Sequence, residues 1–304
     1  MMPHRAAAFL RTAATIAMLV AAVTAVQAQC VPAPVPPEVA RSCDQKYPRW
    51  TGEAASFGVN ALLGGVSAGV LRELRGGSFR DGFFRGAVGG SVIYVSKRVA
   101  ASEFDGAGLV GRELGSVGGS VVRNAGEGRG MFSQLVFPVG IARLYVNTER
   151  KSVRFVPDMT AIGWTISGIV ENELRLDWSE SLSAGTPVFL ADNRILILDN
   201  DSAHVGGLTS SGVIFLANVA AFGKDVARIN LKHERVHVVQ EDQVFQTITD
   251  PFEDWAMSKV PHVGNFLVRR IDINLASELF GVLGNQLPKF LDRPWETEAI
   301  FRAR

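Results

Sequence analysis

Apolar residues and glycines recur at helical spacing along the part of the chain that follows residue 50. Small residues four positions apart form a flat stripe on a helix, and a second helix packs closely against such a stripe. The stripes are Gly65 and Gly69; Gly82, Gly86 and Gly90; and Gly111, Gly115 and Gly119. They predict three glycine-spaced helices, near Phe57–Leu74, Phe79–Ala100 and Gly106–Asn124.

The spacing changes in the middle third, where short runs of β-branched and aromatic residues alternate with turn signals. Such runs predict strands, and their succession favours one antiparallel sheet or half-barrel. The predicted strands are Phe132–Val139, Ala142–Asn147, Ser152–Val156, Ile162–Val170, Glu173–Trp178, Pro187–Ala191, Arg194–Leu198 and Gly212–Asn218. Helical spacing then returns. The predicted fold class is therefore α+β, with glycine-rich N-terminal helices, a central antiparallel β-sheet and a C-terminal helical part.

The first residues match an export signal. Arg5 and Arg11 precede the uncharged, mostly apolar stretch Ala13–Val26, and the small residue Ala28 follows it. This arrangement predicts a signal peptide that is cleaved after Ala28, and hence a location in the periplasm or cell envelope. The alternative is an uncleaved membrane anchor, for which the apolar stretch is short.

Export determines the expected state of the two cysteines. Cys30 and Cys43 both follow the cleavage site, and an oxidising compartment favours a disulfide between them. The proline-rich segment between them belongs to a leader, residues 29–50, that is expected to be extended.

Charge and composition exclude several classes of protein. The chain has 31 Lys and Arg residues against 30 Asp and Glu residues, so it lacks the excess of positive charge that nucleic-acid binders carry. Its hydrophobic fraction of 47% excludes a disordered chain. What remains is a globular protein, whose oligomeric state the sequence does not indicate.

The glycine-rich helices raise the question of a membrane. Ala54–Leu71 carries no charge and is barely long enough to span a bilayer, but it contains Asn60 and several glycines and serines. The next helix carries Arg80, Asp81 and Arg85 within it. These residues favour a soluble or surface-lying helical platform, associated at most with a membrane surface, over a spanning hairpin.

The C-terminal third contains the sequence His233-Glu-Arg-Val-His237. Residues four apart lie on one face of a helix, so both histidines can hold one metal ion with Glu234 beside them. Two neutral imidazoles bind Zn²⁺ and leave it Lewis acidic, and a third protein ligand leaves the fourth position to water. Glu234 would accept a proton from that water as it attacks a carbonyl.

The segment His233-Glu-Arg-Val-His-Val-Val-Gln240 resembles the His-Glu-Arg-x-His-Val-x-Gln helix of a set of uncharacterised bacterial envelope proteins. Those proteins look like members of the zincin metallopeptidase superfamily, in its gluzincin branch. They commonly carry a later Pro-[Phe/Trp]-Glu-x-x-Ala segment, which is Pro294-Trp-Glu-Thr-Glu-Ala299 here. The resemblance implies a zincin-like C-terminal part, Glu296 as third zinc ligand, and a peptide or protein substrate. The chain departs from better-known gluzincins at Ile300, where they have an acid that supports the ligand.

Other residues compete for the role of third ligand. Glu298 lies two residues from Glu296 and would point elsewhere on a helix. His262 and His204 are lone loop histidines, for which a ligand or oxyanion-stabilising role and a solvated one both stay open.

Five segments organise the chain: a signal peptide (1–28), the leader (29–50), a glycine-rich helical region (51–130), a β-rich region (131–220) and a zincin-like helical region (221–304). Two classes of function stay open. The first is a zinc metallopeptidase of the cell envelope, which hydrolyses a peptide bond by Glu234-assisted attack of metal-bound water. The second is a non-catalytic envelope or membrane-associated protein with a structural or vestigial metal site. Only the first requires an open fourth coordination position.

Overall fold

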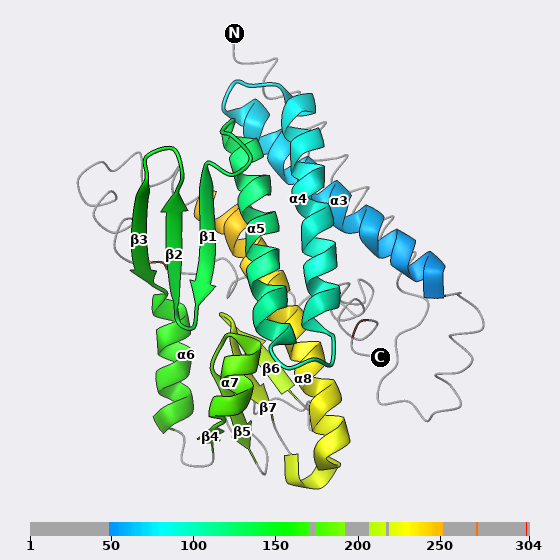
Figure 1. Ribbon diagram of the computed structural model, residues 1–304, viewed down its shortest axis with the longest axis vertical. Helices are drawn as coiled ribbons and strands as arrows, with labels where there is room; N and C mark the ends of the chain where they lie inside the picture. Colours follow the sequence, from blue (N-terminus) through cyan, green and yellow to red (C-terminus); the bar gives the residue numbers. More distant parts are fainter. Residues whose placement is uncertain are drawn as a thin grey trace, which may run out of the picture.

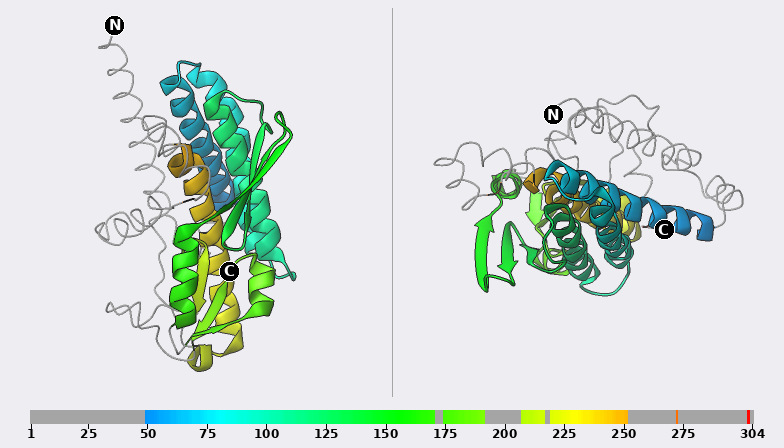
Figure 2. Two further views of the ribbon diagram at one scale, coloured as in Figure 1. Left: turned by 90° about the vertical axis from the view of Figure 1, so that its left-hand side faces the viewer. Right: turned by 90° about the horizontal axis from the view of Figure 1, so that it is seen from above.

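The computed structural model describes residues 49–170, 174–191, 207–216, 219–251, 272 and 302. Three N-terminal helices stand side by side, and two small sheets lie next to them. Helix α8 (Val219–Val244) crosses behind α5 (Ala107–Glu127), from the level of one sheet to that of the other (Figures 1 and 2). The predicted α+β class is thereby confirmed. The predicted signal peptide, Cys30, Cys43 and the predicted strand Arg194–Leu198 lie outside the described residues.

The three predicted glycine-spaced helices are present, although α3 begins at Arg49, ahead of the predicted Phe57. They are α3 (Arg49–Leu74), α4 (Phe79–Ala100) and α5. Ser78 caps α4, because its hydroxyl oxygen accepts a hydrogen bond from the Asp81 amide at 3.4 Å. Gly106 and Gly128 flank α5 in the left-handed conformation, with φ angles of 85° and 75°, which glycine adopts without strain.

Close approach of the helix backbones explains the glycines. A Cβ atom added at Gly89 of α4 would lie 2.6 Å from the carbonyl oxygen of Gly118 in α5, and one added at Gly118 would lie 2.8 Å from the carbonyl oxygen of Gly89. On the other side of α4, a Cβ at Gly86 would collide with the Gly64 carbonyl and with Ala68. The glycines therefore allow α4 to pack backbone to backbone between α3 and α5.

The first sheet contains three antiparallel strands, β1 (Gln134–Val139), β2 (Ala142–Asn147) and β3 (Ser152–Pro157). All three were predicted to within two residues. Val136, Tyr145 and Val156 form a buried cluster, one residue from each strand. The Val136 amide donates to the Ser120 hydroxyl at 2.9 Å, which joins the sheet to α5.

The second sheet has the order β4-β5-β7-β6 and is mixed. Its strands are β4 (Leu174–Leu176), β5 (Val188–Ala191), β6 (Gly207–Ser210) and β7 (Val213–Leu216). β5 and β7 are parallel, whereas the β4–β5 and β6–β7 pairs are antiparallel. The prediction of one antiparallel sheet or half-barrel was therefore wrong, because the strands divide between two sheets and one pair is parallel.

The predicted strand Ile162–Val170 was also wrong, since these residues belong to helix α6 (Met159–Val170). The Asp158 carboxylate accepts a hydrogen bond from the Ala161 amide at 3.1 Å and starts the helix. Helix α7 (Trp178–Ala184) was not predicted. It starts in the same way, with Asp177 accepting from the Glu180 amide at 3.0 Å, and it shortens the predicted strand Glu173–Trp178 to β4.

Helix α8 packs against α5 at Gly108 and Gly115, whereas Gly111 of the predicted stripe faces Ala100 of α4. Added Cβ atoms on α5 would lie 3.0 Å from Arg235 Cδ at Gly108 and 2.9 Å from Val239 Cγ1 at Gly115. Since each residue turns about 100° around a helix, His233 and His237 lie on roughly the opposite side of α8 from this contact. A turn of π-helix, η2 (Phe245–Thr249), continues α8 toward the first sheet.

Buried ion pairs connect α8 to α5 and β2. Asp242 of α8 accepts from Arg112 of α5 at 2.7 Å and lies 3.7 Å from Arg143 of β2. Arg143 also pairs with Asp158 at 2.6 Å and with Asp272 at 3.6 Å. Three carboxylates raise the pKa of Arg143 despite its burial, so the guanidinium stays charged. Breaking such a pair leaves an uncompensated buried charge, so the network fixes the orientation of α8.

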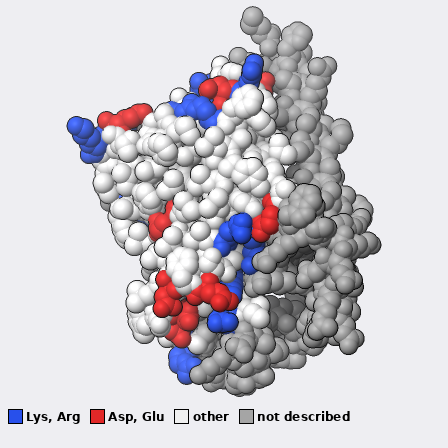
Figure 3. Space-filling model, turned by 45° about the vertical axis from the view of Figure 1, so that its right-hand side comes forward, with Lys and Arg blue, Asp and Glu red and all other residues white. Residues whose placement is uncertain are grey.

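The helical platform exposes apolar side chains. One segment of the described residues, Gly52–Leu74, is long and apolar enough to cross a membrane, and 33% of its most apolar window is buried. Phe84 and Val88 of α4 are 58% and 50% exposed. Figure 3 brings the α3–α4 side forward and shows few charged side chains across its middle.

Candidate metal centre

The two predicted histidine ligands meet on the surface of α8. The Nε2 atoms of His233 and His237 lie 2.9 Å apart, and their ring centroids are 4.5 Å apart with the ring planes at 83°. Two nitrogens bound tetrahedrally to one Zn²⁺ at about 2.05 Å lie about 3.3 Å apart. The pair is therefore within a few tenths of an ångström of the spacing that zinc requires, and both side chains are half-buried.

Gln240 orients the second histidine. Nδ1 of His237 lies 2.7 Å from Oε1 of Gln240, one turn further along α8. Because an amide oxygen only accepts, the proton sits on Nδ1, and the Nε2 lone pair points toward His233. A metal at this point would replace the proton that the two Nε2 atoms share. The sequence motif includes Gln240, but its role as an orienting group comes from the structure.

Glu234, the residue after His233 in α8, is held by the mixed sheet. Its side chain is buried, with the residue 4% exposed. The Thr209 hydroxyl of β6 lies 2.8 Å from Oε2 of Glu234 and 3.2 Å from its main-chain oxygen. Sequence reasoning missed Thr209, because no spacing rule links a strand residue to a helix residue 25 positions later.

A second anchor aligns the β6–β7 hairpin with α8. The hairpin turns at Ser211 and Gly212, whose φ angles of 47° and 75° fit a two-residue type I′ turn. The Gly212 amide donates to Oε2 of Glu241 at 2.6 Å. Glu234 and Glu241 are seven residues apart, so they lie on one face of α8. Their contacts with Thr209 and Gly212 hold the β6–β7 hairpin against this face.

Arg235, the positively charged residue inside the motif, contacts α7 rather than the histidines. Its guanidinium donates to Glu180 at 3.1 Å and to Ser183 at 3.0 Å, both in α7. Burial lowers the pKa of Arg235, and the Glu180 carboxylate opposes that shift. Arg235 therefore joins α8 to α7 and takes no part in holding a metal.

The structure brings His233 and His237 together at their Nε2 atoms, with Glu234 on the same helix. Within the described residues no group of three His, Cys, Asp or Glu side chains could hold a metal ion. Glu296, Glu298, His262 and His204 all lie outside the described residues. The donors that are described, two imidazoles with one ring oriented by an amide, fit zinc.

No protein-family model, curated protein or solved structure matches the chain. The chemistry of this centre must therefore be argued from its own residues.

Proposed function

We propose that the protein is a zinc-dependent metallopeptidase, exported to the periplasm or cell envelope and in contact with its membrane surface. The observation that carries the proposal is the convergence of the Nε2 atoms of His233 and His237 at 2.9 Å, on the helix that also carries the buried Glu234 carboxylate. We assign the third ligand position to Glu296, following the segment Pro294-Trp-Glu-Thr-Glu-Ala299.

Each described residue has a defined task in this proposal. Zinc, when bound, supplies a Lewis acid that polarises the scissile carbonyl and lowers the pKa of water. His233 and His237 hold it, and Gln240 keeps the His237 ring in the required tautomer. Glu234 is the group that accepts the proton of the attacking water and returns it to the leaving amine. Thr209 fixes the carboxylate by its contact with Oε2.

The position of β6 supports a peptide as substrate. β6 is the end strand of the mixed sheet in the described part of the chain, and it lies against α8 at Glu234. An extended peptide adds to a strand edge through main-chain hydrogen bonds. Binding in this way would place a peptide bond next to the Glu234 carboxylate.

Hydrolysis of fluorescently labelled casein by the purified exported protein tests the proposal. Glu234→Gln preserves the shape of the side chain but removes the base, so we expect zinc content to stay and hydrolysis to fall by about 100-fold or more. Glu73→Gln, the same change at an exposed glutamate of α3, serves as the control and should retain activity. A zinc-loaded wild type that cleaves no peptide would instead support a non-catalytic envelope protein.

A further inference from the structure

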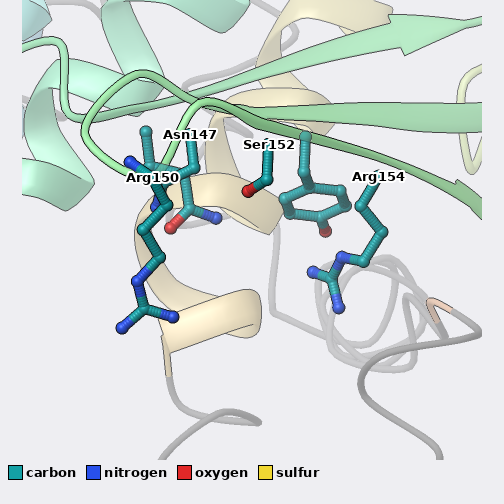
Figure 4. Close-up of a pocket in the computed structure, with 6 residues that line it drawn as sticks. Asn147, Arg150, Ser152 and Arg154 are labelled. Carbon is teal, nitrogen blue, oxygen red and sulfur yellow. The ribbon is translucent and has the colours of Figure 1, made fainter.

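An open cavity of about 320 Å³ lies on the first sheet and its β2–β3 turn, away from the residues of the metal centre. It is lined by Gln134, Tyr145, Asn147, Arg150, Ser152 and Arg154. Figure 4 shows Arg150 and Arg154 extending from the strands in the same direction, with Asn147 and Ser152 between them. This volume is at the lower end of the range for small-molecule sites, about 300–1,000 Å³.

The lining presents hydrogen-bond donors. The Oδ1 atom of Asn147 accepts from the Arg150 amide at 2.7 Å, and Oε1 of Gln134 accepts from the Arg129 guanidinium. With each oxygen engaged in this way, the NH₂ groups are what the two amides offer to a ligand. Ser152 adds a hydroxyl. None of the six lining residues is acidic.

Arg154 is positioned by stacking. Its guanidinium carbon lies 4.5 Å from the centroid of the Tyr145 ring. The Tyr145 hydroxyl donates to Asp272 at 2.9 Å, and burial with the nearby acids Asp250 and Asp272 raises the pKa of Tyr145 well above its usual value. The phenol therefore stays neutral. Asp272 lies 3.6 Å from Arg143; burial raises its pKa, and the charges of Arg143 and Arg154 oppose that shift.

The neighbouring turn carries the acidic Glu149 and the basic residues Arg150 and Lys151. Glu149, next to Arg150 in the chain, accepts a hydrogen bond from the Ser133 hydroxyl. Lys151 follows Arg150 and adds a further positive charge to the turn without lining the cavity.

We propose that this cavity binds the phosphate group of a small phosphomonoester. Guanidinium groups match the oxygens of an oxyanion, and several donors on different sides suit a phosphate, which has more acceptor oxygens than a carboxylate. The cavity volume of about 320 Å³ leaves room for an organic part beside the phosphate.

Isothermal titration calorimetry of the full chain with glycerol 3-phosphate tests this site. Arg150 is exposed, so Arg150→Gln should leave the fold intact. We expect it to weaken binding by about tenfold or more, because it removes a charge-assisted contact. Lys151→Gln makes the same change of charge in the same turn and should alter the Kd by less than about twofold. His233→Ala should bind as the wild type does, which separates this cavity from the metal centre.

Three outcomes would overturn the proposal. The first is the absence of heat from glycerol 3-phosphate with a wild type that is folded by circular dichroism. The second is an equal loss of affinity in Arg150→Gln and Lys151→Gln, which would indicate a general charge effect. The third is tighter binding of glycerate than of glycerol 3-phosphate, which would indicate a carboxylate site.

Discussion

The hydroxyl of Thr209 lies 2.8 Å from Oε2 of Glu234, so a strand of the mixed sheet holds the residue that we propose as the base. A hydrogen bond to a buried carboxylate is costly to lose, because the desolvated group has few substitutes. The position of the Glu234 carboxylate therefore depends on the placement of the β6–β7 hairpin.

Replacement of Thr209 tests this contact. Thr209→Val keeps the shape but removes the hydroxyl, so we expect the free energy of unfolding to fall by about 1–3 kcal/mol, measured by urea denaturation. Thr209→Ser keeps the hydroxyl and should recover most of that loss. Equal stability of Thr209→Val and the wild type would show that the hydrogen bond contributes nothing.

The glycine stripe gives a second prediction. Gly86→Leu and Gly115→Leu should each destabilise the protein by at least about 2 kcal/mol, because Gly86 faces the Gly64 carbonyl and Gly115 faces Val239. Gly58 of α3 has no atom within 4 Å of an added Cβ. The control Gly58→Ala should therefore be stabilising by up to about 1 kcal/mol. Thermal unfolding separates the cases, and unchanged midpoints for both leucine variants would contradict tight packing.

The Arg112–Asp242 pair should behave as a coupled unit. In Arg112→Met, the buried Asp242 carboxylate keeps, among the described residues, the more distant ion pair with Arg143 at 3.7 Å. We expect the free energy of unfolding to fall by about 3–5 kcal/mol. The double variant Arg112→Met/Asp242→Leu removes both charges. Its free energy of unfolding should therefore fall by much less than the sum of the falls in the two single variants. Urea denaturation of the three variants measures the coupling energy. If the change in the double variant equals the sum of the changes in the single variants, the two residues are not coupled.

Glu113 predicts a pH dependence of stability. Burial raises its pKa to about 7, Arg112 opposes the shift, and Asp242 adds to it. The unfolded carboxyl ionises near pH 4.5, so between pH 4.5 and 7 the unfolded state binds fewer protons and stability falls as the pH rises. Glu113→Gln should therefore gain stability over the wild type across this window, by about 1–2 kcal/mol once solvent screening is included, and the gain should level off above pH 7. A difference that does not change between pH 5 and pH 8 would contradict the shift.

Local signals were enough to predict much of the fold. The bounds of α4 and β2 agree with the prediction, because Ser78 is a capping residue and Asn147 begins a turn. The run Ile162–Val170 predicts a strand because β-branched residues dominate it, but its helix is set by Asp158, which lies outside the run. The parallel β5–β7 pair joins strands that are distant in the chain, and periodicity does not report such pairings.

The candidate site was predictable only along α8. The spacing of His233 and His237 places them on one face without any knowledge of the fold. Thr209 and the direction of Arg235 depend on which strand and helix pack against α8, which is a tertiary property. The third ligand rests on the sequence resemblance alone.

Elemental analysis of bound zinc is the most direct test of the central claim. The purified wild type should contain one zinc ion per chain. His233→Ala and Glu296→Ala each remove one of three ligands and should lose most of it, whereas Glu234→Gln should retain it, because the base lies outside the coordination sphere. A wild type purified without zinc that does not take it up on addition would contradict the metal centre, and full retention in Glu296→Ala would reject Glu296 as its third ligand.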